Sequence, residues 1–286
     1  MVRKAVLPSA GLGTRFLPVT KAIPKEMLPL LDRPCIAYVV AEAVEAGITE
    51  IVLVTARGKS AMVDYFDRAP LLEAQLEAAG KREMLAEVRA IARQATIITI
   101  RQQEQLGLGH AVLSAATVVG DEPFAVMLGD DIIDATRPVI GQLLVEHERV
   151  GGVVVALQEV PREETRRYGI CAGPMLRPDF MRVEAMVEKP PPEQAPSNLS
   201  IVGRYVLPSG IFAVLRETAP GAGGEIQLTD ALARYATDGA AHGLLFEGQR
   251  FDTGNPLGLL DATLHFALKD PRYAADTRAL LRQYAG

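Results

Sequence analysis

Residues 5–18 read Ala-Val-Leu-Pro-Ser-Ala-Gly-Leu-Gly-Thr-Arg-Phe-Leu-Pro, and this stretch decides the fold class. Its first three residues predict a buried strand. Gly11 and Gly13 follow in a turn where backbone N–H groups can approach an anion closely. Arg15 and Lys25 come next, separated by prolines that stiffen the intervening loop. A strand that leads into a glycine-rich loop with basic side chains is typical of phosphate binding, so the sequence indicates a nucleotide site.

Two common phosphate-binding motifs do not fit this stretch. The dinucleotide fingerprint needs a small residue at position 16 and an acidic residue after the next strand. Phe16 is large, and the expected strand 51–55 leads into Ala-Arg. A Walker-type loop that ends at Gly58-Lys59-Ser60 would need glycine at position 53, which is Leu. The remaining alternative is a purely structural turn, which gives no reason for two basic residues on one rigid loop.

Composition narrows the class of protein. With 286 residues, 49% of them hydrophobic, the chain can form one large α/β domain or a domain with a smaller appendage. No apolar run approaches the ~18 residues of a membrane span, so we expect no membrane insertion. Cys35 and Cys171 are the two cysteines and cannot form a disulfide framework. We therefore expect a reducing, cytoplasmic location.

Charge is distributed unevenly along the chain. The net charge of −5 argues against nucleic acid as the main partner. Residues 1–33 nevertheless carry six basic side chains against two acidic ones. A local basic site on an acidic protein fits a small polyanionic ligand.

Apolar strands alternate with helices through the chain, which predicts an α/β fold. We expect a Rossmann-like, mostly parallel twisted sheet with helices on both faces, a smaller β part and C-terminal helices. The loops 8–18, 102–107 and 129–131 follow strands and would converge on one ligand at the carboxyl ends of the sheet. The expected strands are 5–7, 50–55, 96–101, 124–128, 153–160, 168–172, 183–188 and 202–207. The expected helices are 34–46, 59–66, 70–93, 109–118, 208–217, 226–237, 255–268 and 274–284, of which 70–93 reads as an insertion.

Acidic residues at two strand ends suggest a divalent cation. Asp130 and Asp131 follow the expected strand 124–128, and Asp252 follows an apolar-flanked segment. Mg²⁺ takes one or two protein carboxylates and leaves its other positions to phosphate and water. The alternative is a capped turn with solvated acids, which is common.

Two further features could recognise parts of a ligand. Glu188 and Lys189 end an expected strand, where neighbouring side chains point to opposite sides. The carboxylate could accept hydrogen bonds from sugar hydroxyls while the ammonium neutralises phosphate. Gln102 offers a donor and an acceptor that match a pyrimidine edge. Standing alone, each of these would be read as a solvated turn or a surface residue.

The sequence lacks the motifs of nucleophilic catalysis. It contains no Gly-x-Ser-x-Gly elbow, and its four histidines show no metal-ligand spacing. If the attacking group were a phosphate, with a second pKa near ~6, it would be mostly ionised at neutral pH. Such a reaction needs positioning and charge neutralisation rather than a base.

Six motifs stand in order along the chain. They are Ala10-Gly-Leu-Gly-Thr-Arg-Phe-Leu-Pro18, Pro24-Lys-Glu-Met-Leu-Pro29, Gly107-Leu-Gly-His-Ala111, Val187-Glu-Lys-Pro190, Gly203-Arg-Tyr-Val206 and Gly224-Glu-Ile-Gln-Leu-Thr-Asp230. With them the sequence, from about residue 3 to residue 268, is similar to the bacterial UTP–glucose-1-phosphate uridylyltransferases (UDP-glucose pyrophosphorylases), a branch of the sugar nucleotidyltransferases. The third and sixth motifs look like the uridylyl branch rather than the thymidylyl one.

The resemblance implies an enzyme that makes UDP-glucose and pyrophosphate from UTP and glucose 1-phosphate by a single, Mg²⁺-dependent in-line displacement. It implies one domain over residues 1–286, with a nucleotide half (about 1–150), a sugar-phosphate half (about 151–268) and a helical tail (269–286). The implied nucleotide-binding residues are Ala10, Gly11 and Gly13, with Gln102 and Gly107 at the uracil. The implied catalytic residues are Arg15, Lys25, Asp130 and Lys189. The implied Mg²⁺ ligands are Asp130 and Asp252, with Asp131 less suited. The implied sugar-binding residues are Gly169, Glu188, Lys189 and Glu225.

Two other functions remain open at this stage. One is the same chemistry with dTTP, a glucose-1-phosphate thymidylyltransferase. The other is a non-catalytic sugar-nucleotide binding protein, which has little need for a metal site and a charge clamp together. The family likeness also implies a homo-oligomer, either a dimer or a tetramer.

Overall fold

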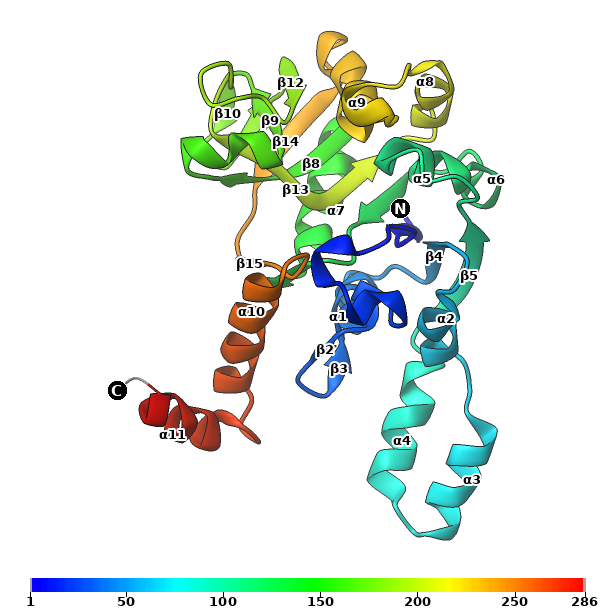
Figure 1. Ribbon diagram of the computed structural model, residues 1–286. Coiled ribbons are helices and arrows are strands. Elements are labelled where there is room, and N and C mark those ends of the chain that lie inside the picture. Colours follow the sequence, from blue (N-terminus) through cyan, green and yellow to red (C-terminus); the bar gives the residue numbers. More distant parts are fainter. Residues whose placement is uncertain (1, 285–286) are drawn as a thin grey trace.

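A computed structural model describes residues 2–284, and its central feature is an eleven-stranded sheet (Figure 1). Met1 and residues 285–286, which belong to the expected domain and its tail, lie outside the described residues. Four parallel strands form one half of the sheet, in the spatial order β5-β4-β1-β6. They are β1 (Lys4–Pro8), β4 (Glu50–Thr55), β5 (Thr96–Arg101) and β6 (Phe124–Met127).

The order of these strands creates a crevice at their carboxyl ends. The chain moves outward from β1 to β4 and β5 and then returns to place β6 on the other side of β1. Ligands of open α/β sheets bind where the strand order reverses in this way. The loop that starts at Ser9 and the turn that carries Asp130 leave the sheet at this point.

The remaining strands extend the sheet beyond β6. Strands β11, β12 and β13 run opposite to the others, so most strands share one direction and the predicted fold class is confirmed. The row continues from β6 through β13 (Leu199–Leu207), β8 (Val153–Glu159), β14 (Ala241–Leu245), β11 (Phe180–Arg182) and β10 (Met175–Arg177). β9 (Gly169–Ala172) pairs with β13 and with β12 (Ala185–Glu188).

Helices cover both faces of the sheet, and each face has its own apolar core. β1 shows why, because Ala5 and Leu7 join one core while Val6 joins the other. The first core is covered by α1 (Cys35–Glu45), α2 (Ser60–Phe66) and α7 (Val139–Val150). The second is covered by α5 (Leu108–Ser114), α8 (Ile211–Glu217) and α9 (Leu228–Thr237), with α6 (Ala116–Val119) beside them.

The expected helix over 70–93 is two helices that form a hairpin. α3 (Pro70–Ala78) and α4 (Arg82–Ile91) project from the sheet beside α2 (Figure 1). The chain reverses at Gly80, whose φ is +68°, and the N–H of Lys81 donates to the carbonyl of Leu76 at 2.9 Å. This bond closes the last turn of α3 as in a Schellman motif.

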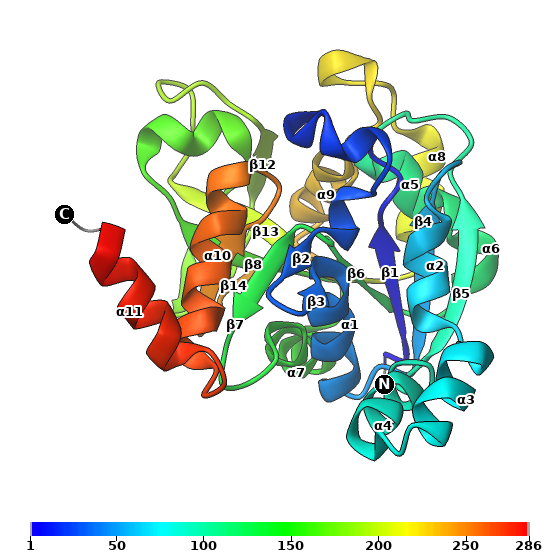
Figure 2. The same cartoon turned by 60° about the horizontal axis from the view of Figure 1, so that its bottom comes forward.

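The C-terminal helices lie on the other side of the molecule from this hairpin. α10 (Pro256–Lys269) packs against the body, and α11 (Ala274–Tyr284) extends from its end (Figure 2). Within residues 2–284, no helix is both long and apolar enough to cross a membrane.

Several short strands were not predicted. β7 (Asp131–Asp134) pairs with β15 (Gln249–Asp252), and β2 (Pro29–Leu30) pairs with β3 (Arg33–Pro34). β7 begins and ends with aspartate and β14 contains Gly243, so neither shows an apolar or alternating pattern. β10 and β11 have three residues each, too few for a period to be visible.

A buried ion pair fixes the turn between β6 and β7. The guanidinium of Arg204, on β13, has no exposed surface and donates to both carboxylate oxygens of Glu42 at 2.6–3.0 Å. Its Nη2 also donates to the carbonyl of Asp131 at 2.8 Å, and its Nη1 to that of Gly203 at 2.9 Å. Arg204 therefore connects α1 and β13 to the backbone that carries Asp130.

We expect Arg204→Met to lower the free energy of unfolding by about 3–5 kcal/mol, because the carboxylate of Glu42, only 10% exposed, would lose its partner. Urea unfolding followed by circular dichroism measures this change. Arg182→Met is the matched control, since Arg182 pairs with Glu184 at the surface, where such a pair contributes about 0–1 kcal/mol. Equal losses in the two variants would contradict a special role for Arg204.

Candidate active site

The loop after β1 folds back onto Lys25. Gly13 has a φ of +66°, and a Cβ there would lie 3.2 Å from both Lys25 Cβ and Thr20 Cγ2. A left-handed residue with so little space favours glycine. Thr20 Oγ1 closes the loop by donating to the Gly13 carbonyl at 2.8 Å. The 3₁₀ helix η1 (Thr14–Phe16) between them carries Arg15.

Lys59 fixes this loop through hydrogen bonds, and the sequence did not predict this role. Its ammonium donates to the Ser9 carbonyl at 2.6 Å and to both carboxylate oxygens of Glu26 at 3.0 and 3.2 Å. Burial raises the pKa of Glu26 and lowers that of Lys59, while the attraction within the pair opposes both shifts. Glu26 directly follows Lys25, so the pair fixes the two ends of the loop relative to each other.

Asp130 and Lys25 meet at the carboxyl end of β6. Lys25 Nζ donates to Asp130 Oδ2 at 2.5 Å. Burial alone would raise the pKa of Asp130, but the attraction and hydrogen bond of Lys25 leave this pKa below its usual value. Burial lowers the pKa of Lys25, and the carboxylates of Asp130 and Glu26 more than compensate. Both groups are therefore charged at neutral pH.

Asp131 is occupied by the protein itself. Its Oδ1 accepts from Arg250 Nε at 2.6 Å, and its Oδ2 accepts from the N–H of Gly203 at 2.8 Å. Burial raises the pKa of Asp131, and the neighbouring Arg250 opposes this shift. With one oxygen on each partner, the side chain serves to join the turn to β13 and β15.

Asp252 lies opposite Asp130 and shares a space with it. A Cβ at Gly254 would lie 2.9 Å from Asp130 Oδ2 and 3.0 Å from Asp252 Oδ1, so both carboxylates border one point. Thr253 fixes their relative position because its N–H and its hydroxyl donate to the Asp130 carbonyl at 2.8 and 2.9 Å. Arg167 Nη2 donates to Asp252 Oδ2 at 2.8 Å.

This arrangement suits Mg²⁺, which takes one or two protein carboxylates and completes its shell with phosphate and water. Among the residues that the structure describes, no group of three or more His, Cys, Asp or Glu side chains could hold a metal by itself. A cation at this point would thus depend on its ligand for the other oxygens.

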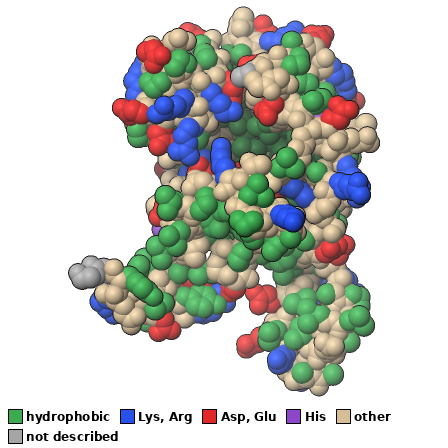
Figure 3. All heavy atoms as spheres, in the orientation of Figure 1, with side chains coloured by type: hydrophobic (Ala, Val, Ile, Leu, Met, Phe, Trp, Pro, Cys, Tyr) green, Lys and Arg blue, Asp and Glu red, His purple; other side chains and the backbone are tan. Residues whose placement is uncertain are grey.

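A cavity of ≈ 500 Å³ opens beside these carboxylates. Figure 3 shows Lys and Arg side chains gathered around a hollow in the upper half of the molecule. Seven of the residues proposed from sequence line the cavity: Arg15, Asp130, Gly169, Glu188, Lys189, Glu225 and Asp252. The polar lining residues to which the sequence assigned no role at the site are Arg166, Arg167, Tyr168, Tyr205, Gln227, Thr229 and Arg250.

Strand geometry predicted that the side chains of Glu188 and Lys189 point to opposite sides, and this prediction is wrong. β12 ends at Glu188, and the φ of Lys189 is +47°, which turns the chain and brings Lys189 Nζ to 3.0 Å from Glu188 Oε1. The other carboxylate oxygen of Glu188 accepts from Thr229 Oγ1 at 2.6 Å. Both side chains therefore face the same cavity.

Gln102 and Gly107 lie in a separate loop beside the cavity and do not line it. Gln102 is 6% exposed, and Gly107 packs against Glu225 and Ile226. Gln105 joins this loop to the first one, because its Nε2 donates to the Ala10 carbonyl at 2.9 Å. Ala10, Gly11, Gly13 and Lys25 are likewise outside the lining of the cavity.

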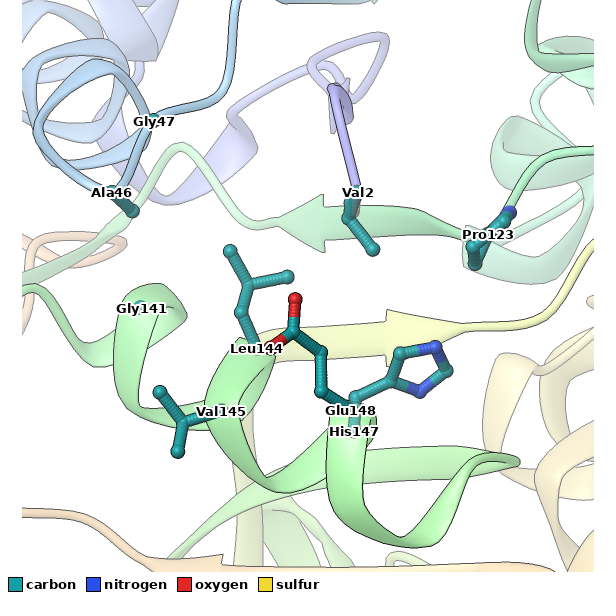
Figure 4. Close-up of a pocket in the computed structure, with 9 residues that line it drawn as sticks. All are labelled: Val2, Ala46, Gly47, Pro123, Gly141, Leu144, Val145, His147 and Glu148. Carbon is teal, nitrogen blue, oxygen red and sulfur yellow. The ribbon is translucent and has the colours of Figure 1, made fainter.

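A second cavity, of ≈ 470 Å³, lies at the opposite edge of the sheet, near the residues that precede β1 and β6 (Figure 4). Leu144, Val145 and His147 of α7 border it, together with Val2 and Pro123. None of the residues proposed from sequence lines it.

Comparisons with known proteins show the family of this chain. The family model described as nucleotidyl transferase matches residues 4–268. UTP–glucose-1-phosphate uridylyltransferase of Bacillus subtilis (strain 168) is 51% identical over 269 residues, which cover 94% of this chain and 92% of the relative.

Two solved structures show the same fold with ligands. A UTP-bound UGPase from Acinetobacter baumannii is 43% identical, with a TM-score of 0.91 over 98% of this chain and 99% of that one. A UDP-glucose pyrophosphorylase complexed with UDP-glucose is 40% identical, with a TM-score of 0.86 over 94% and 100% of the two chains. The chain therefore belongs to the nucleotidyl transferase family and, within it, to the UTP–glucose-1-phosphate uridylyltransferases.

Proposed function

We propose that this chain transfers the uridylyl group of UTP to glucose 1-phosphate and releases pyrophosphate. The observation that carries the proposal is the single cavity lined by Asp130, Asp252, Arg15, Glu188 and Lys189. It combines carboxylates for a cation, basic groups for phosphates and a carboxylate for hydroxyls. The family of this chain and the solved structures with UTP and with UDP-glucose support this reaction. They favour it over transfer of a thymidylyl group and over a function in binding alone.

The reaction is one displacement at the α-phosphorus of UTP. A phosphate oxygen of glucose 1-phosphate forms the new P–O bond as the bond to the bridging oxygen of the β-phosphate breaks, and pyrophosphate leaves with that electron pair. The attacking phosphate has a second pKa near ~6 and is ionised at neutral pH, so no residue has to remove a proton. The protein has to position two anions and neutralise their charge.

The cavity lining and the ion pair of Lys25 with Asp130 support a role for each charged residue. Arg15 and Lys25 hold the triphosphate and the charge that develops on it, and Lys189 holds the phosphate of the sugar. Glu188, whose position is fixed by Thr229, accepts hydrogen bonds from glucose hydroxyls. The other contacts are with backbone and small residues: Ala10, Gly11 and Gly13 at the nucleotide, Gln102 and Gly107 at the uracil, and Gly169 and Glu225 at the sugar.

We also propose that Asp130 and Asp252 hold Mg²⁺, which supplies positive charge to the phosphates when it is bound. Lys25 and Arg167 pair with these two carboxylates in the structure. Before ligands enter, these ion pairs keep the two carboxylates charged and in place. With the cation bound, Lys25 and Arg167 would pair with phosphate oxygens instead.

We extend the proposal to the chain as a whole. The nucleotide is bound by about residues 1–150 and the sugar phosphate by about 151–268. A homo-oligomer, dimer or tetramer, is supported by α11, which buries none of its side chains and leaves Tyr284 86% exposed. A cytoplasmic location is supported by the two buried, free cysteines.

The central test is pyrophosphate release with glucose 1-phosphate and a panel of nucleotides. We expect UTP to be preferred, and dTTP to have a kcat/KM at least roughly 10- to 200-fold lower, because one extra methyl group changes pocket binding by about 1–3 kcal/mol and dTTP also lacks the ribose 2′-hydroxyl. Purine triphosphates should be poorer still. Efficient use of ATP would contradict a uracil site at Gln102, and UTP binding without any turnover would favour the binding protein.

Asp130→Asn should lower turnover by at least about 100-fold, because a hard anionic cation ligand becomes neutral at nearly constant volume. Kinetics over a range of Mg²⁺ concentrations, with thermal unfolding as a check on the fold, measure this effect. Asp261→Asn makes the same change at an exposed position of α10 and should leave turnover unaltered. Near-normal turnover of Asp130→Asn at every Mg²⁺ concentration would remove this residue from the site.

Glu188→Ala and Lys189→Ala should differ in their effects. The first should raise the KM for glucose 1-phosphate and narrow the preference over its epimers, because the acceptor for sugar hydroxyls is lost. The second should lower kcat for every sugar phosphate alike, because positioning of the attacking oxygen contributes several kcal/mol to a barrier, about 7–11 at the extreme. Steady-state kinetics with two sugar 1-phosphates distinguish them, and identical profiles would refute the division of roles.

A further inference from the structure

The side-chain amide of Gln102 is held in one orientation. Its Nε2 lies 3.2 Å from the carbonyl oxygen of Gly107 and 2.9 Å from Nδ1 of His110. A backbone carbonyl can only accept a hydrogen bond, so the NH₂ end of the amide must face Gly107. The backbone N–H of Gln102 is fixed as well, since it donates to the Thr55 carbonyl at 2.9 Å.

His110 takes the second amide hydrogen. Because Nε2 donates, Nδ1 of His110 must be the acceptor, and the neutral imidazole carries its proton on the other ring nitrogen. Both hydrogens of the amide are then used within the protein. No described residue donates to Oε1 of Gln102, and this oxygen is not among the fully buried unpaired atoms. The carbonyl oxygen is thus the one group that Gln102 can offer to a ligand.

The position of this oxygen connects it to the nucleotide. Gln105, in the same loop, donates to the Ala10 carbonyl at 2.9 Å and so joins the loop to the glycine-rich turn after β1. Leu108, which follows Gly107, lines the cavity. Gln102 therefore lies where the base of a nucleotide bound by the first loop can reach it.

We propose that His110 is the residue that makes the base site specific for uracil over cytosine. This proposal rests on the proposed function, because it assumes that the base binds beside Gln102. Uracil presents a protonated N3 to an acceptor, whereas N3 of cytosine is itself an acceptor. A cytosine bound in the same position would place its N3 against Oε1 of Gln102. Two acceptors would then face each other without a hydrogen bond, which disfavours the binding of cytosine. By engaging the second N–H, His110 prevents Gln102 from turning a donor toward cytosine.

The same reasoning predicts that His110 does not affect the preference for uracil over thymine. Both bases have a protonated N3, so an acceptor at Gln102 treats them alike. Discrimination between UTP and dTTP must come from other contacts, either the space around C5 or the ribose 2′-hydroxyl that dTTP lacks. His110 variants should therefore change the ratio of UTP to CTP binding without changing the ratio of UTP to dTTP.

Two matched variants test the role of the acceptor. His110→Asn places a carbonyl oxygen the same number of bonds from Cα as Nδ1, so it can still accept from Gln102. His110→Leu has similar bulk and no acceptor. We expect the ratio of UTP to CTP affinity to fall about tenfold or more in the Leu variant, in line with one lost hydrogen-bond preference. In the Asn variant we expect this ratio to stay within about threefold of the unchanged protein.

Calorimetric titration with UTP, CTP and dTTP in the absence of glucose 1-phosphate measures these ratios without turnover. A purely structural role of His110 would weaken all three nucleotides alike and leave the ratios constant, which would overturn the proposal. Equal behaviour of the Asn and Leu variants would also overturn it. Failure of the proposed function would appear differently, as normal UTP binding with no pyrophosphate release when glucose 1-phosphate is added.

Discussion

The guanidinium of Arg204 reaches no solvent, and the position of the whole site depends on the turn that it holds. A buried charge is stable only when its partners satisfy it, and Arg204 finds them in Glu42 of α1 and in the carbonyls of Asp131 and Gly203. The turn fixes Asp130 against Lys25 and starts β7, which pairs with β15 and so places Asp252. One ionic contact in the core thereby sets the separation of two carboxylates at the surface.

The first half of the fold could be predicted because its strands are continuous runs of apolar and β-branched residues. The stretches 50–55 and 96–101 are strands with the expected bounds, since continuous β-branched and apolar residues leave few alternatives. The second half was harder. β14 and β7 contain glycine or aspartate and are strands only because their neighbours complete the hydrogen bonds. Such strands are determined by tertiary pairing, which a single sequence does not display.

The site follows the same division. Asp130, Glu188 and Asp252 could be proposed from sequence because each ends a strand or an apolar-flanked segment, and the structure brings them around one cavity. Arg167 gave no comparable signal, since it resembles an ordinary surface residue until its partner is known. Thr229 stands in a quoted motif, but its role depends on Glu188, which is distant in the sequence. Arg204 is visible in the sequence, because it belongs to a quoted motif and is the one charged residue of the expected strand 202–207. The strand-end rule also failed at Lys189, where a positive φ reverses the expected direction.

The space beside Gly254 has a consequence for how activity can be lost within this fold. A single methyl group at this position would lie closer to an oxygen of Asp130 and an oxygen of Asp252 than normal van der Waals contact allows, so a carboxylate would have to move. It would remove no charged side chain. A descendant of this chain could thus stop reacting while it retained every charged residue by which an enzyme is recognised from its sequence. Among descendants of this chain, activity therefore depends on Gly254, a residue that has no side-chain functional group.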